Sequence, residues 1–465
     1  MLTHRPLLLA GAPVWTARPC HVVAPFDGRV VSHVSRASSV EAEHAAAAAA
    51  DAFDRTRAAP GRRRATVLRR AAMLLAGRRE AFVSILRDEG GKPVRYGRDE
   101  VARAALLLER CADEAERLDA AMVSDDRTGS ASLLRRCAPR GPVLALGAPH
   151  APLLSACQRI APAVAAGCPI VFVPAATAPG AAIALGEVLL DSGLAAASCG
   201  GALSVIPSPA EVVDHLIADA RFATIVLGGR GRWAARARAG RRHVRIDPGE
   251  RAHAVIEADA DLDAAIPRVA EGAYAHAGQA SAGVQRILVH ASIVDDVLRA
   301  LVAASQRVRI GDPGAEDVVC GPLIDTRAVD RLRAWMDVAP QHGARRLCGG
   351  ENRGDTMVCP AVYTTAHAGE PPNACGPITL VQPYATLDDA LLVLGAAGPG
   401  HHTGLFTADL RKVWRAFERL DAGALIHNDY PGRLGSSQLR LAADARGAPA
   451  HGVEELIDVR TVVLG

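Results

Sequence analysis

The sequence predicts an α/β protein whose centre is a parallel, doubly wound sheet, and three observations support this prediction. From residue 141 to residue 227, short apolar runs typical of buried strands alternate with longer segments whose apolar residues recur every three or four positions. The chain has 465 residues, which is enough for more than one domain. Hydrophobic residues make up 49% of the chain and aromatic residues only 3%, so its cores must consist mainly of Ala, Val, Leu and Ile.

The first third of the chain predicts strands followed by a group of helices. Residues 21–36 alternate apolar and polar around a turn that ends at Gly28, which is typical of a β-hairpin. Ser39 is the candidate N-cap of the first helix. The expected helices cover residues 39–57, 61–75, 77–89 and 97–118. Together these elements precede the alternating region and should pack against its sheet.

The middle of the chain predicts the strands of the parallel sheet. The expected strands are 141–147, 170–173, 203–206 and 224–227, with one of the intervening helices at 181–190. The last strand leads into Gly228 and Gly229 ahead of another helix, a glycine-rich turn whose N–H groups can bind a phosphate. A simple tight turn explains the same glycines. Residues 124–139, which are polar and then alternating, predict a further hairpin.

Composition limits the partners of the protein. The chain carries 53 basic and 50 acidic residues, a net charge of +3, which gives no electrostatic reason to expect nucleic acid or a membrane surface as a partner. No apolar run is long enough for a transmembrane helix. The ten cysteines are scattered without a C-x-x-C pair, so the sequence suggests neither a zinc site nor a disulfide framework. We therefore expect a reduced, cytoplasmic protein.

The segment 277–281 (AGQAS), followed by the apolar strand 284–289, resembles the active-site loop of the aldehyde dehydrogenase superfamily. That family has the pattern A-G-Q-x-C, and Ser281 stands where it has its nucleophilic cysteine. Other landmarks of the family recur in order at 89–93 (EGGKP), 258–263 (ADADLD), 310–324, 375–380 (CGPITL) and 426–430 (IHNDY). The resemblance covers nearly the whole chain and fades near residues 439–447.

The resemblance implies a particular domain organisation. Residues 1–122 and 140–246 would form a Rossmann-like cofactor domain, and residues 247–432 a second α/β domain of the catalytic type. Residues 123–139 and 433–465 would form a small β element for bridging and oligomerisation. Because the family assembles as dimers or tetramers, a homodimer or homotetramer is expected.

The resemblance also assigns the chemical positions, and all three have changed. The family's asparagine, which helps to hold the oxyanion, corresponds to His150 in residues 148–152 (APHAP). Its glutamate, which activates water, corresponds to Asp247, one methylene shorter. A thiol has a free pKa of about 8.5, whereas the hydroxyl of Ser281 needs an adjacent base to act as a nucleophile.

These changes leave two explanations open. Ser281, His150 and Asp247 are the residue set of a Ser–His–Asp hydrolase, which predicts hydrolysis or acyl transfer without a nicotinamide. The alternative is that three unrelated substitutions accumulated after activity was lost. The sequence alone does not show whether Asp247 reaches His150.

The cofactor positions have changed as well. Val173 stands where the family has the lysine that holds the adenine ribose, and Asn373 where it has the glutamate that holds the nicotinamide ribose. Of the family's glycine turn, Gly228 is kept, with Gly229 beside it. Binding of NAD or NADP should therefore be weak or lost. Cys375, on the neighbouring turn, is either a displaced thiol nucleophile or a buried structural cysteine.

Three classes of function remain on this basis. The first is the family reaction, NAD(P)-dependent oxidation of an aldehyde to an acid, which the missing cysteine opposes. The second is a pseudoenzyme that keeps the fold for assembly or for binding an aldehyde or acyl ligand. The third is the cofactor-independent hydrolase. We expect the standard activity to be lost or altered, with the second class ahead of the third.

Overall fold

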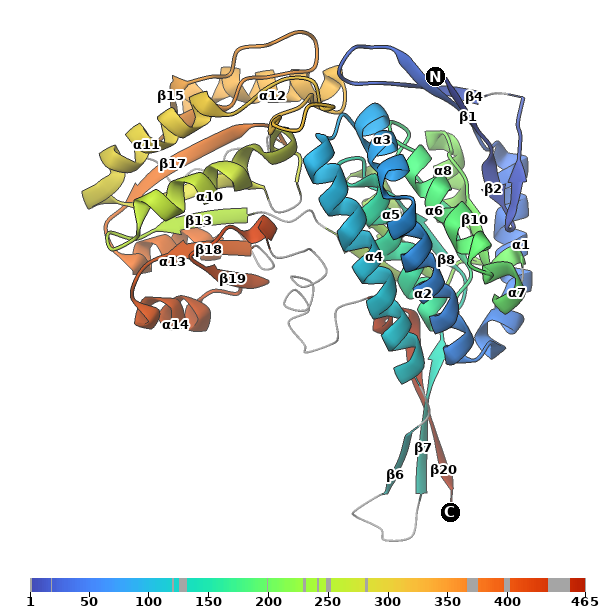
Figure 1. Cartoon of the computed structure of the whole chain (residues 1–465). Helices are drawn as coiled ribbons and strands as arrows, with labels where there is room; N and C mark the ends of the chain where they lie inside the picture. Colours follow the sequence, from blue (N-terminus) through green and yellow to red (C-terminus); the bar gives the residue numbers. More distant parts are fainter. Residues whose placement is uncertain are drawn as a thin grey trace.

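Two seven-stranded sheets form the centres of the computed structural model, and two three-stranded sheets accompany them (Figure 1). The structure describes residues 2–17, 19–118, 121–124, 132–198, 200–228, 231–240, 242–247, 252–280, 283–365, 375–396, 402–433 and 452–464. Helices and parallel strands alternate through most of this range, which confirms the predicted α/β class. Within the described ranges, we find no helix with both the length and the apolar content needed to cross a membrane.

The first seven-stranded sheet contains all four strands predicted from the middle of the chain. In sheet order its strands are β12 (His243–Asp247), β11 (Thr224–Gly228), β8 (Val143–Leu146), β9 (Ile170–Val173), β10 (Leu203–Val205), β2 (Leu7–Leu9) and β3 (Ala12–Val14). The strands from β12 to β10 pair in parallel, and β2 and β3 are antiparallel additions at one edge. The carboxyl ends of the parallel strands therefore share one edge, where doubly wound sheets bind ligands.

Helices cover both faces of the first sheet. They are α1 (Ser39–Ala58), α2 (Gly61–Gly77), α3 (Arg79–Gly90), α4 (Val94–Arg117), α5 (Pro152–Ala166), α6 (Gly180–Asp191), α7 (Leu194–Ser198), α8 (Ala210–Ala218) and α9 (Arg232–Arg238). Alternate residues of β9 face opposite sides: Ile170 and Phe172 join the core under α4, α5 and α6, and Val171 and Val173 the core under α1 and α8. The four predicted N-terminal helices are confirmed within a few residues.

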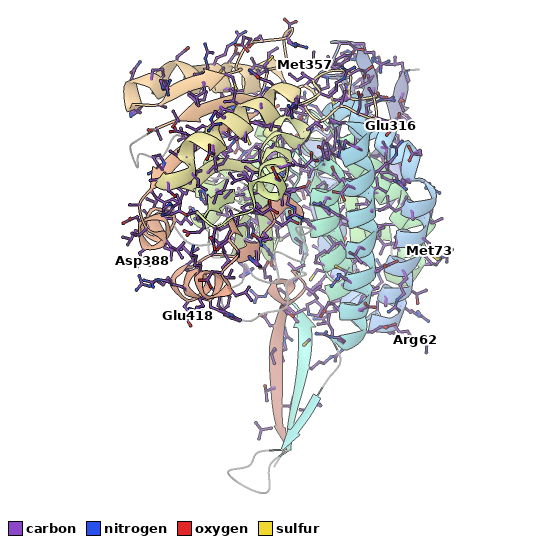
Figure 2. All side chains as sticks on the ribbon, turned by 60° about the vertical axis from the view of Figure 1, so that its left-hand side comes forward. Arg62, Met73, Glu316, Met357, Asp388 and Glu418 are labelled. Carbon is purple, nitrogen blue, oxygen red and sulfur yellow. The ribbon has the colours of Figure 1, made fainter. Side chains whose placement is uncertain are left out.

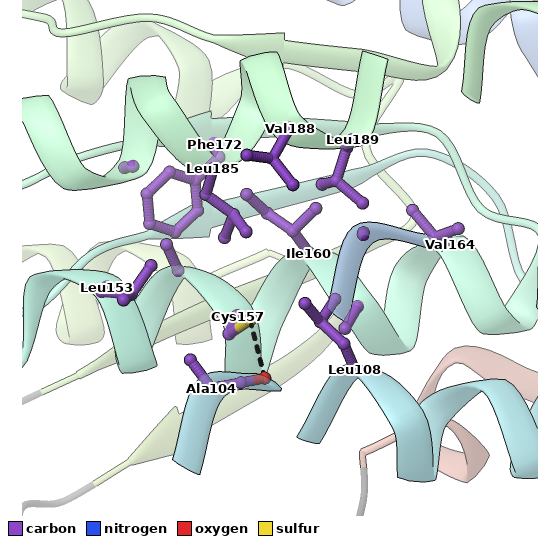
Figure 3. Close-up of a cluster of buried hydrophobic side chains, with 14 of the residues drawn as sticks. Ala104, Leu108, Leu153, Cys157, Ile160, Val164, Phe172, Leu185, Val188 and Leu189 are labelled. Atoms are coloured by element: carbon purple, nitrogen blue, oxygen red, sulfur yellow. Dashed lines mark hydrogen bonds between the residues drawn. The ribbon is translucent and has the colours of Figure 1, made fainter. Parts of the chain in front are cut away.

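The core between α4, α5 and α6 shows how a chain with few aromatic residues packs (Figure 3). Leu153, Ile160 and Val164 of α5 lie against aliphatic side chains of α4 and α6, and Phe172 is the one ring labelled there. The thiol of Cys157 donates to the carbonyl oxygen of Ala104 at 3.5 Å, across α5 and α4. The predicted aliphatic core is thus confirmed, and this cysteine is structural.

The first helix begins at Ser39, as predicted, but its N-cap lies one residue earlier than the sequence suggests. Ser38, not Ser39, is its N-cap: the Ser38 hydroxyl accepts from the Val40 N–H at 3.1 Å. The Glu41 carboxylate accepts from the Ser38 N–H at 2.7 Å, which completes a capping box. Glu41, at the third helical position, thus selects Ser38 over Ser39 as the N-cap, which corrects the prediction of Ser39.

The second seven-stranded sheet lies beside the first in Figure 1. In sheet order its strands are β15 (Arg345–Cys348), β16 (Ala361–Thr364), β17 (Ile378–Tyr384), β14 (Val284–His290), β13 (Ala252–Ile256), β18 (His402–Phe406) and β19 (Ala424–His427). Only the β15–β16 pair is antiparallel among these described strands. Its helices are α10 (Leu262–Tyr274), α11 (Val294–Arg307), α12 (Thr326–Val338), α13 (Leu387–Ala396) and α14 (Leu410–Arg419). Charged side chains such as Glu316, Asp388 and Glu418 project from the surface (Figure 2).

The two small sheets lie outside these cores. Strands β1 (Thr3–Arg5), β5 (Val30–Ser35) and β4 (Pro19–Val23) form one, and the antiparallel β4–β5 pair confirms the hairpin expected at 21–36. The other, which we call the arm, contains β6 (Ala121–Ser124), β7 (Ser132–Pro139) and β20 (Ile457–Leu464). The arm projects from the body of the molecule and carries the C-terminal strand (Figure 1).

Candidate active site

The loop that carries the family motif begins with an unusual turn after α10. Three successive residues, His276, Ala277 and Gly278, have left-handed φ values of 51°, 55° and 68°. Residues other than glycine rarely adopt this conformation, and such strain concentrates at functional sites. Ser281 itself lies outside the described residues, which resume shortly before β14. The described geometry is therefore that of the segment leading to Ser281.

The side chain of Gln279 holds this turn in place. Its amide nitrogen donates to the carbonyl oxygens of His276 at 3.2 Å and Pro322 at 3.0 Å. Its amide oxygen accepts from the Ile324 N–H at 2.8 Å. Gln279 is buried, so these bonds satisfy its donors and its acceptor away from water. The glutamine of the motif thus ties the loop to the segment 322–324.

Glycine is required at position 278 by space as well as by conformation. A Cβ added there would lie 2.2 Å from the carbonyl oxygen of Gly376. The motif loop therefore packs directly on the turn that contains Cys375 and Gly376. Cys375 is exposed at the surface, yet burial by its surroundings raises the pKa of its thiol, so neither alternative for this cysteine is excluded. Asn373 lies outside the described residues.

The segment that carries His150 is fixed by a buried ion pair. His150 precedes α5 by two residues, and no side chain at the N-cap closes the start of that helix. Instead, the Glu100 carboxylate accepts from the Leu153 and Leu154 N–H groups, both at 2.9 Å. Its other oxygen pairs with the Lys92 ammonium, and both partners are buried. A carboxylate at a helix N-terminus is favourable because it satisfies free N–H groups and complements the helix dipole.

The ion pair also lies close to the motif turn. Burial, with smaller contributions from the charges of Lys92 and His150, holds the pKa of His276 well below its ordinary value of 6.5. His276 is therefore neutral at pH 7. His150 thus lies near enough to His276 to lower the pKa of its ring.

Sequence reasoning missed His276, Lys92 and Glu100 as components of the site. His276 is visible in the motif segment, five residues before Ser281, but nothing in the sequence shows that it is buried. Lys92 belongs to the EGGKP landmark, and its partner Glu100 lies eight residues further on α4. Residues eight positions apart are not neighbours on a helix, so the Lys92–Glu100 ion pair depends on tertiary packing.

The predicted Ser–His–Asp set is only partly described. Asp247 ends β12, with its Cα opposite that of Gly228, and its side chain lies outside the described part of the structure, as does Ser281. His150 is half-buried at the start of α5. The triad therefore remains a prediction.

Of the predicted cofactor positions, too, only some lie within the described residues. Val173 ends β9, is 4% exposed and packs in the core under α1 and α8. Gly228 ends β11 and is exposed, whereas Gly229 lies outside the described residues. At the described end of β9, the position thus offers no charged or polar side chain to a ribose, so Val173 does not fit the role of the family's lysine.

The described residues show no metal centre. No three or more His, Cys, Asp or Glu side chains in that part of the chain come together in a group that could hold a metal ion.

Comparison with known proteins defines the class. The aldehyde dehydrogenase family model matches residues 15–438. The chain is 28% identical over 464 residues to 3-sulfolactaldehyde dehydrogenase of Priestia aryabhattai, covering 97% of this chain and 95% of the relative. It is 28% identical over 439 residues to aspartate-semialdehyde dehydrogenase 1 of Pseudomonas canavaninivorans, covering 93% and 91%.

Solved structures agree with these sequence matches. The crystal structure of aldehyde dehydrogenase 21 from Physcomitrella patens, in complex with succinate, covers all of this chain and 98% of its own, with a TM-score of 0.90 and 27% identity. An NAD-dependent aldehyde dehydrogenase from Sinorhizobium meliloti superposes with a TM-score of 0.92 at 24% identity, which shows the fold alone. The chain belongs to the aldehyde dehydrogenase family, and the resemblance found in its sequence is confirmed.

Proposed function

We propose that this protein binds a small aldehyde or acyl compound in the family's pocket but does not oxidise it with NAD(P) at the rate usual in the family. The proposal is supported by the sequence motif, which has Ser281 where the family has its cysteine, directly after a turn that a hydrogen bond of Gln279 and the close packing of Gly278 fix in place. A hydroxyl ionises far less readily than a thiol. In this proposal the motif turn is therefore kept while the reactive sulfur is lost.

The cofactor side supports the same proposal. Val173 is apolar and buried where the family has a lysine, and Asn373 replaces a carboxylate. Each lost charge-assisted hydrogen bond weakens binding by about 1.5–3 kcal/mol. Two such losses lower the affinity for NAD(P) by roughly two to four powers of ten.

The ligand class follows from the proteins that this chain resembles and from His150. Two relatives are named for 3-sulfolactaldehyde and aspartate semialdehyde, aldehydes that carry an anionic group. In this proposal His150 takes the place of the oxyanion-holding asparagine, and a ring N–H donates to the carbonyl oxygen of the ligand. Asp247 remains the candidate for the water-facing carboxylate.

Calorimetric titration of the purified protein tests the proposal. NAD⁺ and NADP⁺ should bind with millimolar affinity or not at all, and the aldehydes 3-sulfolactaldehyde and aspartate semialdehyde should serve as binding probes. The variant Ser281→Cys supplies the missing thiol, and Ser281→Ala is its matched control. Micromolar cofactor binding together with aldehyde oxidation by the parent would overturn the proposal.

A second function is favoured by one observation, the electrostatic coupling of His150 to the motif turn. In this alternative Ser281 Oγ gives its proton to His150 and bonds to the carbonyl carbon of an ester or thioester. The bond to the leaving group breaks, His150 returns the proton to that group, and water then cleaves the acyl-serine. Hydrolysis of p-nitrophenyl acetate should fall to background in both Ser281→Ala and His150→Gln if this is correct. Equal rates in the parent and both variants exclude it.

We further propose that the protein is a cytoplasmic homodimer or homotetramer. The arm exposes Val459, Val462 and Val463 on β20, by 64%, 52% and 64%, and such a patch favours burial against another copy. The described cysteines carry free thiols, which suits a reducing compartment. Light scattering after size-exclusion chromatography measures the assembly of the parent and of Val462→Asp, which places a charge in the patch. A monomeric parent would contradict the proposal.

A further inference from the structure

We propose that a pocket lined by β1, β5, α3 and α6 binds a small zwitterion, an amino acid with an aliphatic side chain. Its carboxylate would pair with Arg5, and its ammonium group with Glu187. None of the residues that line this pocket belongs to the motif turn or to α5. The proposal therefore goes beyond the proposed function and does not depend on it.

The size and the wall of the pocket suit a molecule of this kind. The cavity measures about 390 Å³, within the range of about 300–1,000 Å³ that is usual for small-molecule sites. Val31, Phe82 and Ile85 contribute an apolar part of its wall. An apolar wall with a few polar groups that fix orientation is typical of a ligand site. This wall can pack against a branched aliphatic side chain.

The frame of the pocket is fixed by the carboxylate of Glu89, at the end of α3. Its Oε1 accepts from the Ser32 hydroxyl at 2.8 Å, and its Oε2 accepts from the Gly180 N–H at 2.7 Å. Glu89 is 3% exposed, and a Cβ added at Gly180 would lie 2.4 Å from its Oε1. The end of α3 is thus held against β5 and the start of α6, and both oxygens of this carboxylate already have donors.

Two further charged residues of the lining also have partners. The Arg78 guanidinium donates to Asp191 at 2.7 Å, which joins the start of α3 to the end of α6. The carboxylate of Asp88 accepts from the Nε–H of Arg87 at 2.8 Å. These contacts, together with those of Glu89, hold the walls of the pocket in place and use the charges that make them.

Arg5 and Glu187 are the lining charges that remain unpaired. Both are half-buried, and neither side chain forms a hydrogen bond or an ion pair with any other residue in the described ranges, so that Nε of Arg5 is buried without a partner. Burial raises the pKa of Glu187, and the charge of Arg5 opposes that shift, so the two groups act on the same space without closing on each other. Charges that have lost part of their water without gaining a partner favour a ligand that supplies the opposite charges.

A ligand with a single charge fits this pocket less well. A cation alone would be repelled by Arg5, and the described residues contain no group of three or more His, Cys, Asp or Glu side chains that could hold a metal ion. An anion alone would leave Glu187 without a partner. A zwitterion engages both groups, because a guanidinium binds a carboxylate through paired N–H donors and an ammonium group donates to a carboxylate.

Calorimetric titration of the full-length protein with L-valine tests the proposal. Isovalerate lacks the ammonium group and isobutylamine lacks the carboxylate, whereas both keep the branched carbon chain of valine. Valine should bind about tenfold more tightly than either, or better, in line with one charge-assisted hydrogen bond. Equal affinity for valine and isovalerate, or for valine and isobutylamine, would show that only one charge is recognised and would overturn the proposal. Failure of valine to bind at millimolar concentration would overturn it as well.

Two variants remove the charges of the pocket separately. Arg5→Met and Glu187→Gln break no ion pair of the described structure, so both should fold, which unfolding in urea checks. Each should weaken valine binding about tenfold or more; Glu187→Gln should lose the preference over isovalerate, and Arg5→Met that over isobutylamine. Arg411→Met and Glu418→Gln make the same charge changes on the exposed surface of α14 and should leave the affinity unchanged.

An unchanged affinity for valine in Arg5→Met or Glu187→Gln, or an equal loss in the two surface controls, contradicts the proposal. The valine titrations do not involve the aldehyde probes or NAD(P). Failure of the zwitterion site and failure of the proposed function are therefore observed independently.

Discussion

Two regions of the candidate site differ in how much of the family's pattern they keep. One is the motif turn at residues 275–280, and the other is the pair of strand ends at Val173 and Gly228. At the turn, hydrogen bonds from Gln279 and a backbone contact too close for any Cβ keep the family frame. At the end of β9, Val173 packs into the core, at the position where the sequence resemblance predicts the family's lysine. The comparison teaches that contacts made by backbone and glycine resist change, because each alternative clashes. A side chain at a strand end has no such restraint, so on the predicted assignment of Val173 a ligand-binding residue there is replaced without disturbing the fold.

The largest effect is expected from removing the buried ion pair between Lys92 and Glu100, which lies at the start of α5. Glu100→Gln leaves the Lys92 ammonium buried without its partner, which costs about 3–5 kcal/mol of unfolding free energy. Urea denaturation measures the loss. Glu116→Gln is the control, since Glu116 pairs with Arg69 on the exposed surface, and it should change stability far less. Equal losses in the two variants would mean that the buried pair does not support the frame.

The next test challenges the turn itself. Gly278→Ala combines a left-handed φ of 68° with a Cβ at 2.2 Å from the Gly376 carbonyl oxygen. Strain and overpacking together should cost about 2–5 kcal/mol. Gly28→Ala has a similar φ of 72° and nothing within 4 Å, so it isolates the conformational part, about 1–2 kcal/mol. If the two variants unfold at the same urea concentration, the contact with Gly376 is not what requires glycine.

A third test addresses the cofactor side. Val173→Lys restores a cation at the strand end and should raise NAD⁺ affinity about ten- to a hundredfold, in line with one charge-assisted hydrogen bond. Some stability should be lost, because Val173 is buried. Val173→Met, which is long and uncharged, serves as the control in the same calorimetric titration. A gain in both variants would show that size rather than charge limits binding.

The smallest effect is a pH dependence of stability. The pKa of His276 is held well below 6.5 in the folded protein, so below pH 6.5 the unfolded chain binds a proton that the folded chain does not. Stability should therefore fall as pH falls from 6.5, by up to about 1.4 kcal/mol per pH unit until the folded pKa is reached. Urea denaturation between pH 7 and pH 5 measures it. His276→Asn should show a slope smaller by that amount, and an identical slope would contradict the burial of a neutral ring.

Much of the fold could be predicted because its signals are local. Apolar runs located β8, β9 and β11 within two residues, since a buried parallel strand must be apolar on both faces. The capping of α1 was placed one residue too late, because two serines compete and only Glu41 decides between them. The sequence left the role of Cys375 open, since exposure depends on what packs over a turn.

By itself, the sequence determined the α/β class, the order of the elements and the family, and it predicted Ser281, His150 and Asp247 as the candidate chemical positions. These follow from periodicity and from short motifs, which need no knowledge of distant contacts. Only the tertiary structure decided that His276 is buried and neutral, and that Glu100 joins Lys92 to the start of α5. His276 and His150 are 126 positions apart in the chain. The effect of His150 on the pKa of His276 therefore depends on tertiary packing, and no local pattern encodes it.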